Sequence, residues 1–299
     1  MKILTIGNFG HGWDGSVCDE EHIASALEEL GHEVTRWQRE NIKPGGELSI
    51  EHPVDFVLIA QWDGYVADNF VEWIRDRALG APVVYWAFDY QNDGQEWHER
   101  LVKEADLYLS KRIADSKYPN WRWLSQDFAP KFLFPLREHV EKDIDVLFTG
   151  SYLDWAKTRN DTLKAVDNQF NLTIHSVNEW PGFKDQRAPI MDDGLPELYA
   201  RAKVVLSIDH TLEAGYWSDR NAQIMCCGVR PLFAYIPLSE VHFGNHVDYF
   251  YSIDDCLEKV QQRLDNPIPL DTGLYTYAQK NLKVINRVQD LLTIVESIL

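Results

Sequence analysis

The sequence predicts an α/β fold made of two doubly wound parallel sheets. Short apolar runs alternate with amphipathic helical segments up to about residue 137, and the same alternation begins again at Ile144. Several of the runs end in glycine-rich or polar loops, which is where ligands bind in folds of this class. The stretch 128–137 between the two halves contains two prolines and no clean period, so we expect the crossing between two domains there.

The first half opens with a strand at Lys2–Ile6 and a glycine-rich loop at 7–15. Further strands are expected at 54–60, 82–86 and 106–109, and helices at 18–30, 70–79 and around Leu101. Gly10, Gly12 and Gly15 spell GxGxxG but lie some distance past the strand, so they are a weak dinucleotide signature. We expect the loop to let backbone approach a ligand closely; a plain surface turn is the alternative.

The second half has the same rhythm. Strands are expected at 144–149, 172–175, 204–208 and 230–234, and helices at 158–166, 195–202 and 254–264, followed by a long terminal helical stretch, 275–299. Two such halves form a cleft on which the loops after their strands could converge.

The segment Tyr216–Gly228 is the strongest local signal. It follows an apolar strand; Ser218 or Asp219 can cap its helix and Gly228 can end it. Arg220 in the first turn adds a bidentate donor suited to phosphate. The expected ligand is the diphosphate of a nucleotide; the alternative is a surface ion pair between Asp219 and Arg220.

Composition narrows the function classes. The 299 residues carry a formal net charge of −18, which argues against a generally basic nucleic-acid surface. We expect a cytoplasmic protein, because we find neither an N-terminal signal nor an apolar run long enough to span a bilayer. The four cysteines have no metal-ligand spacing, so we expect free thiols, no metal and no cofactor.

Several motifs occur together in this order: Asp145–Ser151, Arg159 at a helix start, Leu198–Ser207, Gly215–Arg220 with Gly228, Tyr251–Glu258 and Asn286–Leu292. In this combination they resemble the CgeB-like (spore-maturation-protein) glycosyltransferases. The resemblance implies a GT-B fold: an acceptor domain at 1–137, a nucleotide-sugar donor domain at 138–280, and a terminal helix at 281–299 packed across the junction. It also implies that Gly150 and Ser151 approach the donor and that Arg159, Ser218, Asp219 and Arg220 hold its diphosphate.

Gln223 departs from the family pattern, because many related enzymes carry a glutamate there. An amide offers a ribose diol one acceptor oxygen rather than two, which puts ribose recognition in question. The full predicted donor-binding set is Gly12, Trp13, Gly150, Ser151, Tyr152, Arg159, His210, Tyr216, Ser218, Asp219, Arg220, Asn221 and Gln223.

Catalysis is assigned to the first half. Asp89, at the end of a strand, and Asp14, in the glycine loop, are the candidates for binding sugar hydroxyls or taking the acceptor proton. A structural cap or surface charge is the alternative for Asp89. Four tryptophans near the cleft loops are candidates for stacking on sugar rings, although core positions are the alternative: Trp13, Trp62, Trp86 and Trp217.

The predicted function is sugar transfer from a nucleoside-diphosphate sugar to a hydroxyl acceptor, without a metal and, from the resemblance, with retention. One alternative is a DNA-base-directed transferase, favoured by a locally basic stretch: Arg112, Lys117, Arg122, Lys131 and Arg137. A second is a catalytically inactive GT-B-like binding protein, suggested by Gln223. A nucleotide-sugar epimerase is a weaker third.

Overall fold

The computed structural model describes residues 1–10, 17–39, 42, 52–60, 69–88, 94–126, 128–129 and 135–299. Contacts divide the chain into two compact units. The first comprises Met1–Gln126 together with Val284–Leu299, and the second comprises Asp127–Lys283. The chain therefore leaves the first unit once and returns to it near its C-terminus.

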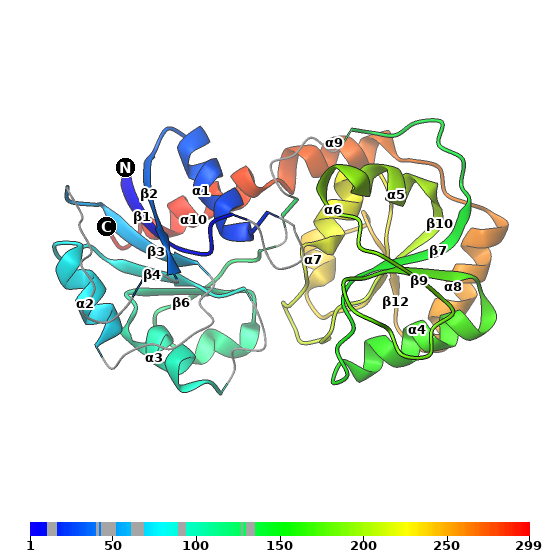
Figure 1. The fold of residues 1–299 in the computed structure, drawn as a ribbon, viewed down its shortest axis with the longest axis horizontal. Coiled ribbons are helices and arrows are strands. Elements are labelled where there is room, and N and C mark those ends of the chain that lie inside the picture. The colour runs from blue at the N-terminus through cyan, green and yellow to red at the C-terminus, as the bar shows by residue number, and fades with distance from the viewer. Residues whose placement is uncertain are drawn as a thin grey trace. The chain divides into compact units, whose positions relative to one another are not determined.

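The described part of the first unit contains a parallel sheet in the order β2-β1-β3-β4-β5-β6 (Figure 1). Its strands are β1 (Lys2–Gly7), β2 (Glu33–Gln38), β3 (Phe56–Ala60), β4 (Val83–Trp86), β5 (Leu107–Ser110) and β6 (Trp121–Trp123). Its helices are α1 (Asp19–Glu29), α2 (Phe70–Arg77), α3 (Glu96–Glu104), the 3₁₀ turn η3 (Ile113–Lys117) and α10 (Val284–Val295). Every residue of β3 and β4 is buried, as expected for parallel strands covered on both faces.

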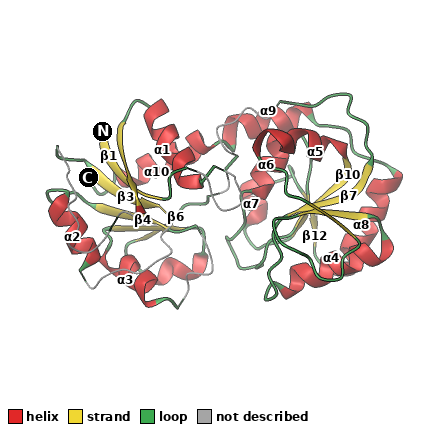
Figure 2. Ribbon diagram, in the orientation of Figure 1, coloured by secondary structure: helices red, strands yellow, loops and turns green. Residues whose placement is uncertain are grey.

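The second unit contains a parallel sheet in the order β12-β11-β10-β7-β8-β9. Its strands are β7 (Ile144–Thr149), β8 (Leu172–His175), β9 (Asp185–Arg187), β10 (Ala202–Ser207), β11 (Leu232–Ala234) and β12 (Asp248–Phe250). Its helices are α4 (Lys157–Gln169), the 3₁₀ turn η4 (Asp192–Gly194), α5 (Leu195–Arg201), α6 (Arg220–Cys226), α7 (Ser239–Phe243), α8 (Ile253–Asp265) and α9 (Thr272–Asn281). Helices α4 and α8 cover one face of this sheet, and α5, α6 and α9 cover the other (Figure 2).

The predicted doubly wound α/β fold is confirmed, and the predicted central strands match to within a few residues. The sequence analysis missed β2, β6, β9 and β12. All four are sheet edges in the described residues, and three of them are only three residues long. Short edge strands bury little side-chain area, so they leave no apolar run to detect.

The prediction of one helical stretch from 275 to 299 was wrong. Helix α9 ends at Asn281 and α10 begins at Val284, because Leu282 leaves the helical conformation with φ −116° and ψ 22°. The Leu282 carbonyl accepts a hydrogen bond from the Ala129 amide at 2.7 Å, and Lys283 forms a bridge with Ala129. The break is set by a segment far away in sequence, so helical periodicity could not reveal it.

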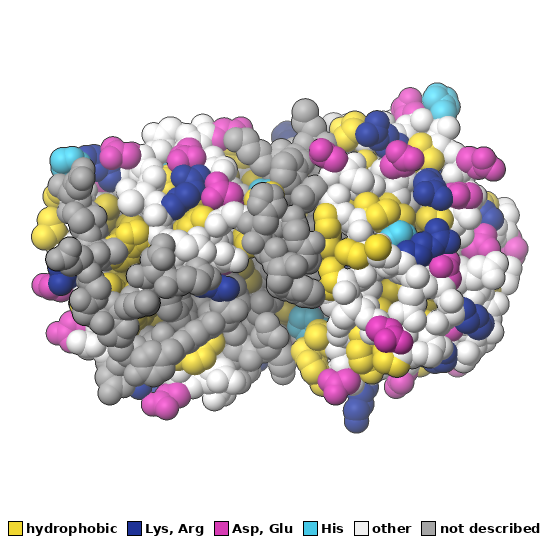
Figure 3. Space-filling model, viewed as in Figure 1, with side chains coloured by type: hydrophobic (Ala, Val, Ile, Leu, Met, Phe, Trp, Pro, Cys, Tyr) yellow, Lys and Arg dark blue, Asp and Glu magenta, His cyan; other side chains and the backbone are white. Residues whose placement is uncertain are grey.

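Acidic and basic side chains are interspersed over the visible face of the second unit, with no continuous basic field on that face (Figure 3). Arg112, from the predicted basic stretch, is buried and lies 3.7 Å from Asp115. It therefore contributes nothing to an exposed basic surface.

Candidate functional site

The second sheet reverses its winding direction between β7 and β10. From β7 the chain passes through α4 to β8 on one side of β7. It later returns through α5 to β10 on the other side of β7 and continues through α6 to β11. The loops that follow β7 and β10 therefore diverge to opposite faces of the sheet at its carboxyl edge, which is where the ligand-binding crevice lies in folds of this class. Gly150 and Ser151 follow β7, and Asp209 begins the loop after β10.

Arg220, the first residue of α6, reaches back to this crevice. Its Nε donates to the Thr149 carbonyl at 2.7 Å, and its Nη1 donates to the Ile208 carbonyl at 3.3 Å and lies 3.4 Å from the Asp209 carboxylate. These bonds tie the guanidinium to the last residue of β7 and the end of β10. Its Nη2 has no hydrogen-bond partner among the described residues, so one edge of the fork remains available to a ligand.

Arg159, from α4, lies beside it and is only 3% exposed. Its Nη2 donates to the Ser151 carbonyl at 2.9 Å, while its buried Nε has no partner in the described residues. Burial, reinforced by the charge of Arg220, lowers the pKa of Arg159 to about 10. Arg159 remains charged at neutral pH, so two guanidinium groups repel each other in a poorly hydrated place.

Asp209 is the buried carboxylate that faces both arginines. It is 2% exposed, and its Oδ1 accepts from the Ser218 hydroxyl at 2.5 Å as well as lying near Arg220. One carboxylate against two guanidinium groups leaves a net positive charge at the crevice. A site of this kind favours an anion. The sequence analysis did not single out Asp209, although its position directly after a buried strand was a usable signal.

The absence of a side chain at Gly150 leaves room for the Arg220 guanidinium. The φ of Gly150 is +149°, and a Cβ there would lie 2.8 Å from Arg220 Nη2 and 3.3 Å from the Phe148 ring. A side chain at this position would push the guanidinium away. The glycine predicted to approach the donor thus has a defined local role beside Arg220.

The predicted cap position at Asp219 is confirmed, but the expected capping hydrogen bond is not made. Asp219 occupies the cap position of α6 with helical φ and ψ and makes no capping hydrogen bond. The Ser218 hydroxyl instead donates to Asp209, and the Asp219 carboxylate accepts from the Gln223 amide one turn later. The competing partner explains the failure in each case. Asn221 is fully buried, and both polar atoms of its side chain lack partners in the described residues.

Aromatic side chains line the rest of the site. The His210 ring lies between those of Trp155 and Tyr216, with both centroid separations 5.0 Å. Tyr216 is buried, whereas Trp155 is 44% exposed. On the other side the Tyr152 ring meets the buried Trp180 edge-on at 5.3 Å.

The predicted residues of the first half lie largely outside the described residues. These are Gly12, Trp13, Asp14, Trp62 and Asp89. Trp86 and Trp217 are described, but at 0% and 1% exposure they have no free face for a sugar ring. Their placement agrees with the alternative that they are core residues.

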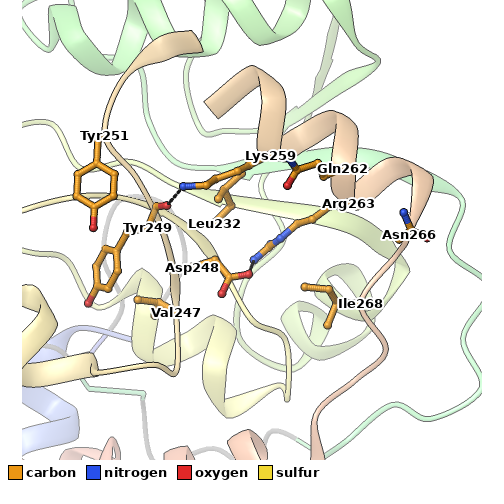
Figure 4. A pocket seen from close by; sticks show the side chains of 10 residues that line it. All are labelled: Leu232, Val247, Asp248, Tyr249, Tyr251, Lys259, Gln262, Arg263, Asn266 and Ile268. Carbon is orange, nitrogen blue, oxygen red and sulfur yellow. Dashed lines mark hydrogen bonds and ion pairs between the residues drawn. The ribbon is translucent and has the colours of Figure 1, made fainter. Parts of the chain in front are cut away.

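A separate hollow of about 690 Å³ lies at the edge strand β12, two strands from β10 (Figure 4). Its two cations are already paired: Arg263 with Asp248 at 2.5 Å, and Lys259 with the Tyr249 carbonyl at 2.6 Å and with Asp255. The crevice at β7 and β10 is therefore the better candidate for an anion.

In the described residues, no group of three or more His, Cys, Asp or Glu side chains is arranged to hold a metal ion. The described helices also include none with the length and apolarity needed to cross a bilayer.

Comparison with known proteins agrees with this geometry. Residues 137–272, which include both arginines, match the model of a family described as glycosyl transferase-like. A search of curated proteins gave no match. Sucrose-phosphate synthase from Thermosynechococcus elongatus superposes with a TM-score of 0.64 at 11% identity, covering 99% of this chain and 98% of that one. The fold is GT-B.

Two further GT-B structures were solved with nucleotide present. Anabaena HepE in complex with UDP-glucose has a TM-score of 0.59 at 13% identity, covering 99% of this chain and all of that one. An alpha-glucosyltransferase in complex with UDP and a DNA 13-mer has a TM-score of 0.58 at 13% identity, covering 98% and 95% of the two chains.

Proposed function

We propose that this protein is a glycosyltransferase that moves a sugar from a nucleoside-diphosphate sugar to a hydroxyl acceptor. The observation that carries the proposal is the pair of arginines at the winding reversal of the second sheet. Arg159 and Arg220 hold backbone carbonyls, face one buried carboxylate, and keep guanidinium N–H groups without partners among the described residues.

Such a pair suits the chemistry of the leaving group. When the bond from the sugar to the diphosphate breaks, negative charge grows on the diphosphate oxygens. Preorganised guanidinium groups stabilise that charge as it develops, and they do so without a metal ion. We therefore propose metal-independent transfer, with Ser151 as a further contact to the diphosphate and with Gln223 near the ribose.

The acceptor side is proposed from the sequence alone. Asp89 or Asp14 would orient the acceptor hydroxyl or take its proton, with retention of configuration at the anomeric carbon. We further propose the CgeB-like subfamily and a cytoplasmic location. Because two similar folds were solved with UDP or UDP-glucose, uridine nucleotides are the first donors to test.

Thermal unfolding with a panel of nucleoside diphosphates and nucleotide sugars tests the site. A ligand at 100 times its dissociation constant raises stability by about 2.7 kcal/mol. The stabilisation should disappear in Arg220→Ala and persist in Arg201→Ala, an arginine of the same unit whose partner is the exposed Asp143.

The donor that stabilises the protein is then incubated with and without acceptors. Release of the diphosphate that depends on Arg220 would support a transferase and exclude an inactive binding protein. Binding without any turnover would favour the binding protein, and the absence of binding to every nucleotide would contradict the proposed site.

A further inference from the structure

Hydrogen bonds fix the backbone of Gly150 and Tyr152 in the loop after β7. The Gly150 amide donates to the His175 carbonyl at 3.0 Å, and the Gly150 carbonyl accepts from Trp180 Nε1, also at 3.0 Å. The Asn178 side chain binds the backbone of Tyr152 at both polar atoms. Asn178 Oδ1 accepts from the Tyr152 amide at 2.7 Å, and Asn178 Nδ2 donates to the Tyr152 carbonyl at 2.9 Å.

The residues that do the holding come from the loop after β8 and are themselves fixed. The Ser176 hydroxyl donates to the Asn178 carbonyl at 2.7 Å and to its Oδ1 at 3.0 Å. Gln186 binds the Trp180 backbone at both polar atoms, with distances of 2.6 Å to its amide and 2.7 Å to its carbonyl. Trp180 is fully buried. The exposed Asn178 thus bonds both the N–H and the carbonyl of Tyr152, and Ser176 orients Asn178 in turn. Together these bonds restrict the conformation of the loop after β7.

Ser151 lies between the two held residues. Its carbonyl accepts from Arg159 Nη2. Its backbone N–H and its hydroxyl make no hydrogen bond within the part of the chain that the structure describes, and the residue is partly exposed. Ser151 thus presents two donors that have no partner among the described residues, directly beside the buried Arg159.

We propose that Asn178 and Trp180 are positioning residues that hold the Ser151 N–H and hydroxyl in place for a phosphate group of the donor. This inference rests on the proposed function, because it assumes that a diphosphate binds at Arg159 and Arg220. Asn178 touches no phosphate itself. It acts by restricting the conformation of the Gly150–Tyr152 loop. Because the Ser151 N–H and hydroxyl are already ordered, ligand binding does not carry the entropy cost of ordering them.

The test measures affinity for inorganic diphosphate and for the nucleoside diphosphate that stabilises the wild type, using the full chain. Asn178→Ala should weaken both by about ten-fold, as for the loss of a hydrogen bond to a charged group, with affinity for the corresponding nucleoside unchanged. Asn171→Ala is the matched control, because Asn171 flanks the opposite end of β8 and its side-chain amide donates to the Asp145 carboxylate at 2.9 Å.

A double-mutant cycle with Ser151→Ala separates positioning from general stability. Ser151→Ala removes the hydroxyl and keeps the N–H, so if Asn178 positions that hydroxyl, the combined loss in diphosphate affinity should be smaller than the sum of the two single losses. Additive losses, equal losses for nucleoside and diphosphate, or an Asn178→Ala variant that behaves like Asn171→Ala would each overturn the inference while leaving the proposed function intact.

Should Asn178→Ala fail to fold, Ser176→Ala replaces it, since it removes only the bonds that orient Asn178. A smaller loss for diphosphate alone supports the inference, and no loss contradicts it. If wild-type protein binds neither inorganic diphosphate nor any nucleotide, the proposed function fails together with this inference.

Discussion

The guanidinium groups of Arg159 and Arg220 lie over the same aromatic ring. Their central carbons are 6.0 Å and 5.0 Å from the centroid of Phe148, the penultimate residue of β7. The negative face of the ring attracts both cations, but it cannot cancel two full charges that also repel each other. A polyanion bound beside these groups would relieve that repulsion, so we expect such a ligand to stabilise the second unit.

Phe148→Leu should weaken this arrangement while keeping the core filled. Loss of the ring face removes about 0.5–2 kcal/mol of cation–π attraction in addition to the packing change. We expect lower affinity for diphosphate, measured by calorimetry. Phe233→Leu is the control, because Phe233 is equally buried in the same sheet and packs against Phe243 and Tyr249. Equal diphosphate affinity in the two variants would argue against a role for the Phe148 ring.

Gly150→Ala should damage both folding and binding. The new Cβ meets Arg220 Nη2 at 2.8 Å in a backbone conformation with φ +149°, so we expect a loss of about 1–3 kcal/mol in unfolding free energy and a clear loss of diphosphate affinity. Gly182 also has a positive φ, +78°, so an alanine there is strained as well, but the nearest atom to its new Cβ would be Lys164 Nζ at 3.9 Å. Gly182→Ala should lose stability only, and a similar binding loss there would point to a global cause.

Asp209→Asn should move stability and affinity in opposite directions. Removing the negative charge increases the repulsion between the arginines, so the unliganded protein should lose about 1–3 kcal/mol. The same change raises the positive potential of the crevice, so diphosphate should bind more tightly. Asp143→Asn breaks an exposed ion pair with Arg201, which solvent screens, and should leave stability nearly unchanged. Weaker diphosphate binding in Asp209→Asn would show that this carboxylate assists the ligand instead.

His22 should make the first unit sensitive to mild acid. Burial lowers its pKa from 6.5 to about 4, although the charge of Glu21 opposes the shift. The unfolded chain therefore binds a proton between about pH 6.5 and 4 that the folded chain does not, and stability falls as the pH drops through that window. The loss approaches about 3 kcal/mol at its limit.

His22→Gln should flatten the pH dependence of unfolding in that window. An NMR titration of His22 in the folded protein gives the pKa directly. A value near 6.5 would contradict the prediction.

The sequence predicted those parts of the fold that depend on local apolar pattern. Strands β3, β7 and β10 were predicted because burial on both faces requires a mostly apolar run, which only Asp145 in β7 and Lys203 in β10 interrupt with a charge. Strand β9 has the sequence Asp-Gln-Arg and is held at the sheet edge by pairing with β8, including a bond from Thr173 to Asp185. A strand of this kind has no local apolar pattern from which it could be predicted.

The same distinction applies to the candidate site. Arg159 and Arg220 were predicted as phosphate ligands from chemistry and from a family resemblance, and the structure brings them together at one crevice. What the sequence could not supply is orientation, because the carbonyls of Thr149 and Ile208 that aim Arg220 lie 71 and 12 residues away. Asn178 was missed for the same reason, since its partner Tyr152 is 26 residues away.

The return of the chain to its first unit has a consequence for biosynthesis. Helix α10 packs against α1 and buries Val288, Leu291 and Val295, yet its residues emerge from the ribosome only after the whole of the second unit. The second unit can thus complete its core first. Until α10 is synthesised, the N-terminal part of the first unit keeps an exposed apolar surface at α1. The N-terminal half should be the more dependent on chaperones during translation, and a chain that stalls before residue 284 should leave that half, rather than the half nearest the stall, unfinished.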